Sequence, residues 1–281
     1  MKRLTAAFIF ALLAFTARAQ AETVNCTAIT SLPAVITVQG VYCFTGNLST
    51  AMTVGNAIDI QTNNVVLDLN GFKLGGLAAG PGTGASGIFA FTRQNITIKN
   101  GTVRGFKYGI WLEDLSPYTT SQGHIIEDIR ADQNTYFGMY IWGTGNVIRN
   151  NQVVATGGST GTIHALGIEA AGPGVRVLNN DVTEVAAQEN GTAIGINVSN
   201  ASNSVVAGNR VGNLTAPIGI NKYGILLQGG SDYLVSDNRL TGMQTGIHFD
   251  GGATGTYMNN LVRSASTPYF GGTPAGTTNF P

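Results

Sequence analysis

The chain has 281 residues, of which 15 are Lys or Arg and 15 are Asp or Glu, so its formal net charge at pH 7 is zero. This balance argues against a nucleic-acid partner and against a polybasic membrane surface, because both need an excess of positive charge. After the N-terminal segment no apolar run approaches the roughly 20 residues that a membrane span needs, so we expect no membrane insertion.

Residues 1–21 have the features of a secretory signal peptide. Lys2 and Arg3 give a basic start, Leu4 to Phe15 is an apolar stretch too short to span a bilayer, and Ala19-Gln20-Ala21 is a small-residue cleavage site. We therefore expect the mature chain to begin near Glu22 and to be exported, as a secreted or periplasmic protein.

Residues 22–56 are predicted to form an N-terminal cap that contains both cysteines, Cys26 and Cys43. In an oxidising compartment an isolated pair so close in sequence is expected to form a disulfide, which contributes about 3 kcal/mol in the loop-entropy picture. The alternative is a pair of unpaired buried thiols. A cap is expected because an open solenoid would otherwise expose unpaired strand edges.

Residues 57–265 carry two landmarks that recur together. The first is a glycine that opens an apolar-alternating segment, as in YGIWLE and LGIEAA. These glycines are Gly87, Gly109, Gly138, Gly167, Gly195, Gly224 and Gly246. The second is an asparagine in NQV, NDV, NRV, NRL and NLV, namely Asn151, Asn180, Asn209, Asn238 and Asn260. Two landmarks that repeat roughly every 22 or 29 residues predict the stacked coils of a solenoid.

Each repeat divides into three extended pieces. In the repeat that opens at Gly167, alternating residues are interrupted by a Gly172-Pro173-Gly174 turn and again by Asn179-Asn180. This pattern predicts an all-β parallel β-helix of about eight coils, with three short strands per coil and a cap at each end. The repeated asparagines are expected to adopt the left-handed conformation of a tight bend and to bond to one another as a ladder. After them, Asp181 and Arg210 are expected to form an exposed ion pair.

The Gly-Ile strand, the Asn turns in VLNNDV and VAGNRV, and the signal peptide resemble the right-handed parallel β-helix repeat proteins of the pectin lyase-like superfamily. The resemblance spans Ala57 to about Arg263. It implies that the Gly-Ile strands form a first sheet, and that the connections into them wall a groove in which a polysaccharide is held.

If the Ile after each glycine faces the core, two rows of side chains face outward from the first sheet. Both tryptophans fall in these rows. The expected carbohydrate-binding residues are Phe89, Trp111, Tyr140, Trp142, Asn197, Gln228, His248 and Asp250. Aromatic rings suit the apolar faces of sugars, and acids and amides suit their hydroxyls. The alternative is that the N-terminal segment or the loops cover the aromatic residues, as in ordinary lateral packing.

Four residues are candidates for catalysis. Glu113 and Glu169 are candidate acids for a hydrolase, whereas His164 and Lys222 are candidate bases for a lyase. Two coils separate Glu113 from Glu169, about 10 Å along the axis, which is more than a two-carboxylate glycosidase uses. The paired-Asp and Gly-His-Gly elements of polygalacturonase-like hydrolases are missing, so whether the chain is an enzyme stays open. The competing interpretation is a non-enzymatic structural or protein-binding solenoid.

No metal or other cofactor is expected. His124, His164 and His248 fall on different coils, so no histidine pair has ligand spacing, and this disfavours the copper-handling role of NosD-like β-helix proteins. Residues 266–281 contain Pro268, Pro274 and Pro281 and are predicted to form a C-terminal capping tail, because proline ends a strand ladder. The oligomeric state is not predicted.

Overall fold

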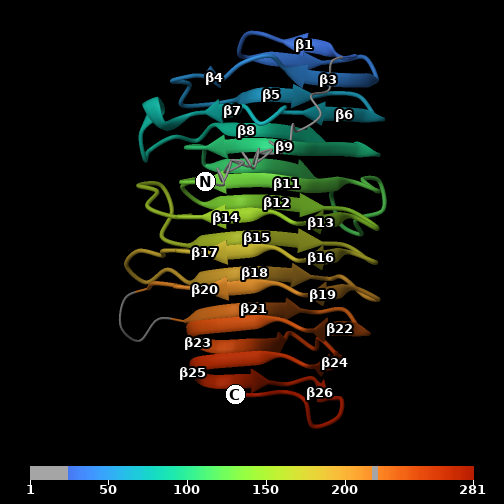
Figure 1. The fold of residues 1–281 in the computed structure, drawn as a ribbon, viewed down its shortest axis with the longest axis vertical. Coiled ribbons are helices and arrows are strands. Elements are labelled where there is room, and N and C mark those ends of the chain that lie inside the picture. The colour runs from blue at the N-terminus through green and yellow to red at the C-terminus, as the bar shows by residue number, and fades with distance from the viewer. Residues whose placement is uncertain (1–24, 217–220) are drawn as a thin grey trace, which may run out of the picture.

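The computed structural model describes residues 25–216 and 221–281. The predicted signal peptide, residues 1–21, lies outside the described residues. The described chain winds into a long solenoid whose strands stack in sequence order, from blue at one end to red at the other (Figure 1). Neighbouring strands pair in parallel throughout the stack. The predicted all-β parallel β-helix is therefore confirmed.

Three sheets run along the solenoid, and four long strands, β9, β11, β23 and β25, bend from one sheet into the next. The first sheet contains β2 (Ala34–Ile36), β5 (Asn56–Ile60), β8 (Ser86–Phe91), β10 (Tyr108–Glu113), β12 (Phe137–Trp142), β15 (Ala165–Ala171), β18 (Ala193–Ser199), β21 (Lys222–Gln228) and the second halves of β23 (Arg239–Asp250) and β25 (Leu261–Phe270). The second sheet contains β1 (Thr27–Ile29), β3 (Gly40–Phe44), β6 (Val65–Asp68), the first halves of β9 (Ile96–Arg104) and β11 (Ile125–Asp132), β13 (Val147–Arg149), β16 (Arg176–Leu178), β19 (Val205–Ala207), β22 (Tyr233–Ser236), β24 (Gly255–Met258) and β26 (Thr273–Pro274). The third sheet contains β4 (Leu48–Ser49), β7 (Lys73–Gly75), the second halves of β9 and β11, β14 (Gln152–Val154), β17 (Asp181–Thr183), β20 (Arg210–Gly212) and the first halves of β23 and β25.

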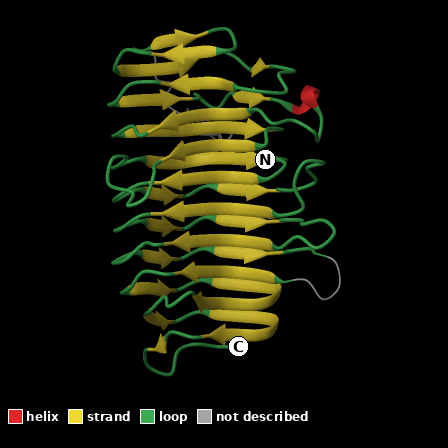
Figure 2. Ribbon diagram, turned by 180° about the vertical axis from the view of Figure 1, so that it is seen from behind, coloured by secondary structure: helices red, strands yellow, loops and turns green. Residues whose placement is uncertain are grey.

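Helical structure is almost absent from the described residues. A single 3-10 turn, η1 (Leu77–Ala79), appears in red beside the stack in Figure 2. Within residues 25–216 and 221–281, no helix has the length and apolarity needed to cross a membrane. The loops, green in Figure 2, lie at the bends between the sheets.

The segment expected to act as the N-terminal cap carries strands of its own. β2, β3 and β4 pair with β5, β6 and β7, so the parallel stacking already begins before Ala57. A disulfide joins Cys26 to Cys43, with 5.8 Å between the two Cα atoms. It ties the start of the described chain to β3, and the alternative of two free thiols is excluded for this structure.

The core is a column of side chains along the axis of the solenoid. The residues after the repeated glycines are fully buried there, namely Ile88, Ile110, Met139, Ile168, Ile196, Ile225 and Ile247. The glycines are required by close approach rather than by a turn. A Cβ on Gly138 would lie 2.5 Å from Val153 Cγ1 and 2.6 Å from the carbonyl oxygen of Gly167. Any side chain here would collide with the third sheet and with the next coil.

The repeated asparagines form the predicted ladder along the bend between the second and third sheets. The Asn180 amide donates to Asn209 Oδ1 at 3.0 Å and to the Ile148 carbonyl at 2.9 Å, and the Asn180 backbone N–H donates to Asn209 Oδ1 at 2.9 Å. The same contacts recur down the stack as far as Asn260, whose amide donates to Asn279. All five ladder side chains are buried.

The expectation that the ladder asparagines themselves adopt the left-handed conformation is wrong. Positive φ angles fall on the residue before each of them: Asn150 (56°), Asn179 (55°), Gly208 (68°), Asp237 (58°) and Asn259 (54°). The bend is made by this outward residue, which is always Asn, Asp or Gly, the types that tolerate that conformation. The following asparagine is thereby turned inward, where its amide is bonded to the next coil.

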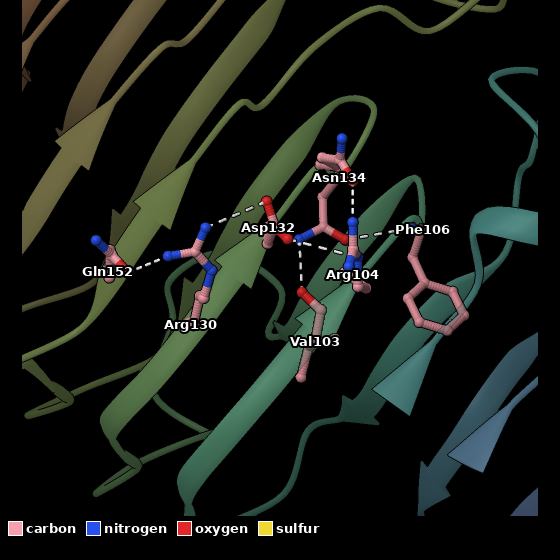
Figure 3. A network of polar contacts seen from close by, with 8 residues as sticks. Val103, Arg104, Phe106, Arg130, Asp132, Asn134 and Gln152 are labelled. Atoms are coloured by element: carbon pink, nitrogen blue, oxygen red, sulfur yellow. Dashed lines mark hydrogen bonds and ion pairs between the residues drawn. The ribbon is translucent and has the colours of Figure 1, made fainter. Parts of the chain in front are cut away.

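Charged side chains cover the outer faces of the second and third sheets. The predicted pair of Asp181 and Arg210 is present, with an Nη2–Oδ2 distance of 2.9 Å. Figure 3 shows a second network, in which Arg130 reaches both Asp132 at 3.8 Å and Gln152 at 2.5 Å. Arg104 also lies 3.4 Å from Asp132. These charged groups pair with one another, so we interpret them as part of the structural framework rather than as a site.

The C-terminal tail adds one more short strand to the stack and then packs against the last coil. Thr273 and Pro274 form β26 on the edge of the second sheet, paired with β24. The Tyr269 hydroxyl donates to backbone carbonyls of Asn260 and Phe280, at 2.9 and 3.0 Å. The tail is thus folded back against the last coil.

Candidate functional site

The candidate site is the outer face of the first sheet. Strand register places one residue per coil in each outward row. The first outward row is Phe89, Trp111, Tyr140, Glu169, Asn197, Leu226 and His248. The second outward row includes Phe91, Glu113, Trp142, Ala171, Ser199, Gln228 and Asp250. Both tryptophans of the chain therefore lie on this face.

A further outward row was missed by the sequence analysis. The residues that precede the glycines also point away from the core, and Phe137, Leu166 and Ile194 form a separate apolar cluster there with Leu226. Strict alternation from the Ile would turn these residues inward. Gly138 and Met139 both face the interior, however, so the alternation restarts at each glycine. We call Tyr108, Phe137, Leu166, Ile194 and Tyr223 the pre-glycine row.

The aromatic residues of these rows pack closely on one another. The Trp111 ring stacks on Tyr108 with 4.5 Å between centroids, and the Trp142 ring stacks on Tyr140 at 4.6 Å. Phe89 meets the Trp111 ring edge-on at 4.9 Å. The aromatic residues therefore pack partly on one another rather than under the N-terminal segment. The aliphatic part of the pre-glycine row is buried by tyrosines, whereas Trp111, Tyr140 and Trp142 stay partly exposed.

Glu169 lies at the end of the aromatic stretch and is buried, only 5% exposed. Asn197 Nδ2 donates to one carboxyl oxygen at 2.7 Å, and Ser199 Oγ donates to the other at 3.1 Å. Burial raises the pKa of Glu169 to about 7, and these two hydrogen bonds oppose the rise. The Trp142 indole is near enough to lower this pKa slightly, although its N–H makes no well-formed hydrogen bond.

Tyrosines surround the carboxyl group on its other side. Burial, and then the charge of Glu169, raises the pKa of Tyr140 and of Tyr136. Both phenols are therefore neutral hydrogen-bonding groups near neutral pH. Beyond Asn197 the polar chain continues, because Asn197 Nδ2 also lies 3.1 Å from Gln228 Oε1. Glu169, Asn197, Ser199 and Gln228 form one connected polar set on β15, β18 and β21.

The other candidate residues lie further from Glu169. Glu113 ends β10, two strands away, and burial raises its pKa as well. His164 lies in the connection before β15, where its Nδ1 accepts a hydrogen bond from the Thr192 N–H at 2.9 Å. Lys222 begins β21 opposite Ala193. His248 contacts the rings of Tyr223 and Phe270, and Asp250 is exposed beside Gln228. The structure does not bring Glu113, His164 or Lys222 into contact with the Glu169 set.

An insertion between β10 and β11 forms a wall beside the second outward row. Buried Asp114 holds it in place by accepting hydrogen bonds from the N–H groups of Leu115, Thr120 and Ser121 at 2.9 to 3.0 Å. Its tip brings Tyr118 edge-on to Trp142, with 5.2 Å between ring centroids. No pattern in the sequence indicates this contact.

Asp114, Ser121 and His124 lie together near this wall, but their hydrogen bonds indicate a structural and not a catalytic role. His124 Nδ1 accepts the Ile96 N–H, so Nε2 must be the donor in the 2.7 Å contact with Ser121 Oγ. Ser121 in turn donates to the Arg93 carbonyl. The proton therefore points the wrong way for activation of the serine, which needs a basic nitrogen facing its hydroxyl. Burial also lowers the pKa of His124 to about 4, so the ring is neutral.

Several polar atoms on the candidate face have no hydrogen-bond partner within the protein. They are the indole nitrogens of Trp111 and Trp142, Asn197 Oδ1 and His248 Nδ1. Such atoms are not confined to this face, since Thr156 Oγ1 and Ser204 Oγ also have no partner within the protein. Among the described residues, no group of three or more His, Cys, Asp or Glu side chains is arranged to hold a metal ion.

The family described as "Right handed beta helix region" matches residues 86–276. The chain belongs to this family. The match confirms the predicted right-handed parallel β-helix and the resemblance to the pectin lyase-like superfamily at the level of the fold. No curated protein sequence matches the chain.

Two solved structures share the fold at low sequence identity. The enzymatically active domain of tailspike protein 2 from bacteriophage CBA120 is similar, with a TM-score of 0.61 and 17% identity. That alignment covers 88% of this chain but only 38% of the tailspike chain. Pectate lyase Pel9A is similar with a TM-score of 0.53 and 12% identity, over 86% of this chain and 72% of the lyase. Identities this low show a common fold and no more.

Proposed function

We propose that this chain is an exported β-helix protein that binds a polysaccharide on the outer face of its first sheet. The observation that carries the proposal is the buried Glu169 carboxyl, placed between aromatic rings on one side and a connected amide and hydroxyl set on the other. Rings stack on the apolar faces of sugars, and the polar set is suited to their hydroxyls. Export is supported by the signal-like residues 1–21 and by the Cys26–Cys43 disulfide.

The solved relatives point in the same direction by what they are called, since one is a pectate lyase and the other an enzymatically active tailspike domain. The binding residues we propose are Phe89, Trp111, Tyr140, Trp142, Glu169, Asn197, Ser199 and Gln228, with His248 and Asp250 further along the face.

Binding is better supported than two-carboxylate hydrolysis. The strands beside Glu169 contribute Tyr140, Trp142, Asn197 and Ser199 rather than a second acid. Glu113 is two strands away, about 10 Å, whereas a glycosidase pair is about 5 to 9.5 Å apart. If a bound glycan is cleaved, Glu169 is the residue placed to donate the proton, because a carboxyl group with a pKa of about 7 is largely protonated below neutral pH.

Tryptophan fluorescence tests the proposal directly, because both tryptophans lie on the proposed face. The mature chain would be titrated with a panel of purified polysaccharides, and a saturable change in emission is expected for at least one of them. Trp142→Ala should weaken that binding roughly tenfold, which corresponds to about 1.4 kcal/mol. Arg239→Gln, an exposed change on the third sheet, serves as the matched control and should bind normally.

Two outcomes would count against the proposal. One is that no polysaccharide in the panel changes the fluorescence or is retained by the protein. The other is that Trp111→Ala and Trp142→Ala alter thermal stability but leave glycan binding intact. An assay of the same mixtures for new reducing ends or unsaturated products would show whether binding leads to cleavage.

A further inference from the structure

Charge is divided unevenly among the three sheets. On the outer face of the first sheet, from β5 to the second half of β23, the ionised types are acidic: Asp59, Glu113, Glu169 and Asp250. Among the described residues, neither outward row nor the pre-glycine row contains a lysine or an arginine. The arginines of the strands lie instead on the second and third sheets, in ion pairs such as Arg149 with Glu127 and Arg210 with Asp181.

Two lysines lie at or just before the start of strands of the candidate face, and Arg93 follows the end of β8, two residues after Phe91. The Lys107 ammonium sits over the rings of Tyr108 and Tyr136, 5.4 and 5.9 Å from their centroids, so it is engaged in cation–π contacts. Lys222 begins β21 in register with the core-lining Ala193, to one side of the pre-glycine row. Lys107 thus lies against the tyrosines beside Trp111, but neither lysine belongs to an outward row of the sheet.

From this distribution we infer that the polysaccharide held on the first sheet is an uncharged one, and that polymers of uronic acids are excluded. This inference rests on the proposed function. A polyuronate carries a carboxylate on each sugar unit, and on this face its charges would approach Asp59, Glu113 and Asp250 with no arginine or lysine in the outward rows to pair with them. Like charges placed together in this way oppose binding and so provide specificity.

The Glu169 set supports the same conclusion. A carboxyl group buried at 5% exposure is already resistant to ionisation, and a second carboxylate brought beside it would make ionisation harder still. The groups around it, Asn197, Ser199 and Gln228, are neutral donors and acceptors. Hydroxyl groups of a neutral sugar can both donate to and accept from such a set, whereas a carboxylate can only accept.

The decisive experiment compares polymers that share a backbone and differ in charge. Polygalacturonate and its fully methyl-esterified form are one pair, and carboxymethyl and hydroxyethyl cellulose are another; laminarin, galactomannan and alginate complete the panel. Affinity would be measured at pH 7.5 by tryptophan fluorescence and by retention in affinity gels. We expect the neutral member of any pair that binds to bind at least tenfold more tightly than its acidic partner. Added NaCl should reduce this difference in affinity, because salt screens the repulsion between the acidic polymer and the acidic side chains.

Substitutions identify the source of the discrimination. Glu113→Gln combined with Asp59→Asn should raise affinity for the acidic polymer severalfold and leave the affinity for the neutral one nearly unchanged. Asp181→Asn on the third sheet removes one acid far from the face and should change neither. Lys107→Gln with Lys222→Gln should also leave neutral binding intact.

The results separate the two proposals. If an acidic polymer binds as tightly as its neutral partner or more tightly, and the double lysine variant loses that binding, the inference of a neutral ligand is overturned while polysaccharide binding stands. If no polymer of either kind binds, the proposed function itself fails. If neutral polymers bind and acidic ones do not, both are supported.

Discussion

The asparagine ladder and the outer face of the first sheet both hold rows of buried polar side chains, but they differ in how completely those groups are bonded. In the ladder each amide donates to the next asparagine and to a backbone carbonyl, and its oxygen accepts in return. On the outer face, Trp111, Trp142, Asn197 and His248 each keep an atom without a partner, and Glu169 has a strongly raised pKa. The saturated row stabilises the fold, whereas the incompletely bonded row lies on the face where we propose that a ligand binds.

The largest effect is expected from breaking the ladder. Asn209→Ala removes four hydrogen bonds, two accepted from Asn180 and one donated to each of Val177 and Asn238, and leaves these partners buried. The free energy of unfolding should fall by about 4 kcal/mol, at roughly 1 kcal/mol for each lost bond. Urea unfolding measures this loss.

A matched control for that change is Asn179→Gly. Asn179 has a φ of 55°, and Gly208 holds the same position one coil later with a φ of 68°. The bend should therefore survive, with a change of less than about 1 kcal/mol. A large loss at Asn179 together with a small one at Asn209 would contradict our assignment of the two roles.

The second prediction is that Glu169→Gln stabilises the protein above neutral pH. The folded pKa of about 7 lies above the ordinary value of 4.5, so the folded protein retains a proton that the unfolded chain releases. The contribution of Glu169 to stability should therefore be fully present below pH 4.5 and fall by about 3 kcal/mol as the pH rises through 7. Unfolding in urea at pH 4.5 and pH 8 measures the difference.

In the Gln variant this loss should be absent, so its advantage should reach about 3 kcal/mol at pH 8 and nearly vanish at pH 4.5. If it is instead less stable than the wild type at pH 8, Glu169 belongs with the saturated, stabilising groups, and the contrast between the two rows is lost. A gain in stability with weaker glycan binding would show that this carboxyl group is kept for binding.

The smallest effect is expected at the surface of the third sheet. Asp181→Asn breaks the pair with Arg210, in which the two side chains are 35% and 62% exposed. The loss should stay under about 0.5 kcal/mol, and high salt should reduce it further. Thermal unfolding at low and high NaCl concentration tests this, and a loss comparable to that of Asn209→Ala would show that the outer charges take part in the stabilising framework.

The framework could be predicted from the sequence because it depends on neighbours one period apart. The glycine and asparagine spacings predicted the coils, the ladder and the outward position of Trp111, Tyr140 and Trp142. The sequence did contain evidence that the residue before each ladder asparagine, and not the asparagine itself, adopts the left-handed conformation. Asn150, Asn179, Gly208, Asp237 and Asn259 are all of the types that tolerate a positive φ.

The candidate site could be predicted only in outline. Its rows follow from alternation, but the burial of Glu169 depends on Asn197, Ser199 and the tyrosine rings, which reach it across neighbouring coils. The pre-glycine row was missed because alternation restarts at the glycine, which no count of apolar residues reveals. The contact of Tyr118 with Trp142 depends on how an irregular insertion folds.

The ladder also bears on how such a protein can change over time. Asn209 bonds to an asparagine 29 residues later and Asn238 to one only 22 residues later, yet the amide contact is 3.0 Å in both coils. The shorter coil lacks the loop into the first sheet, because β23 runs through from the third sheet without a break. The connections into the first sheet can thus become longer or shorter while the asparagine ladder keeps its register. The walls of the site are free to diversify, and so to acquire new specificities, on a scaffold that stays the same.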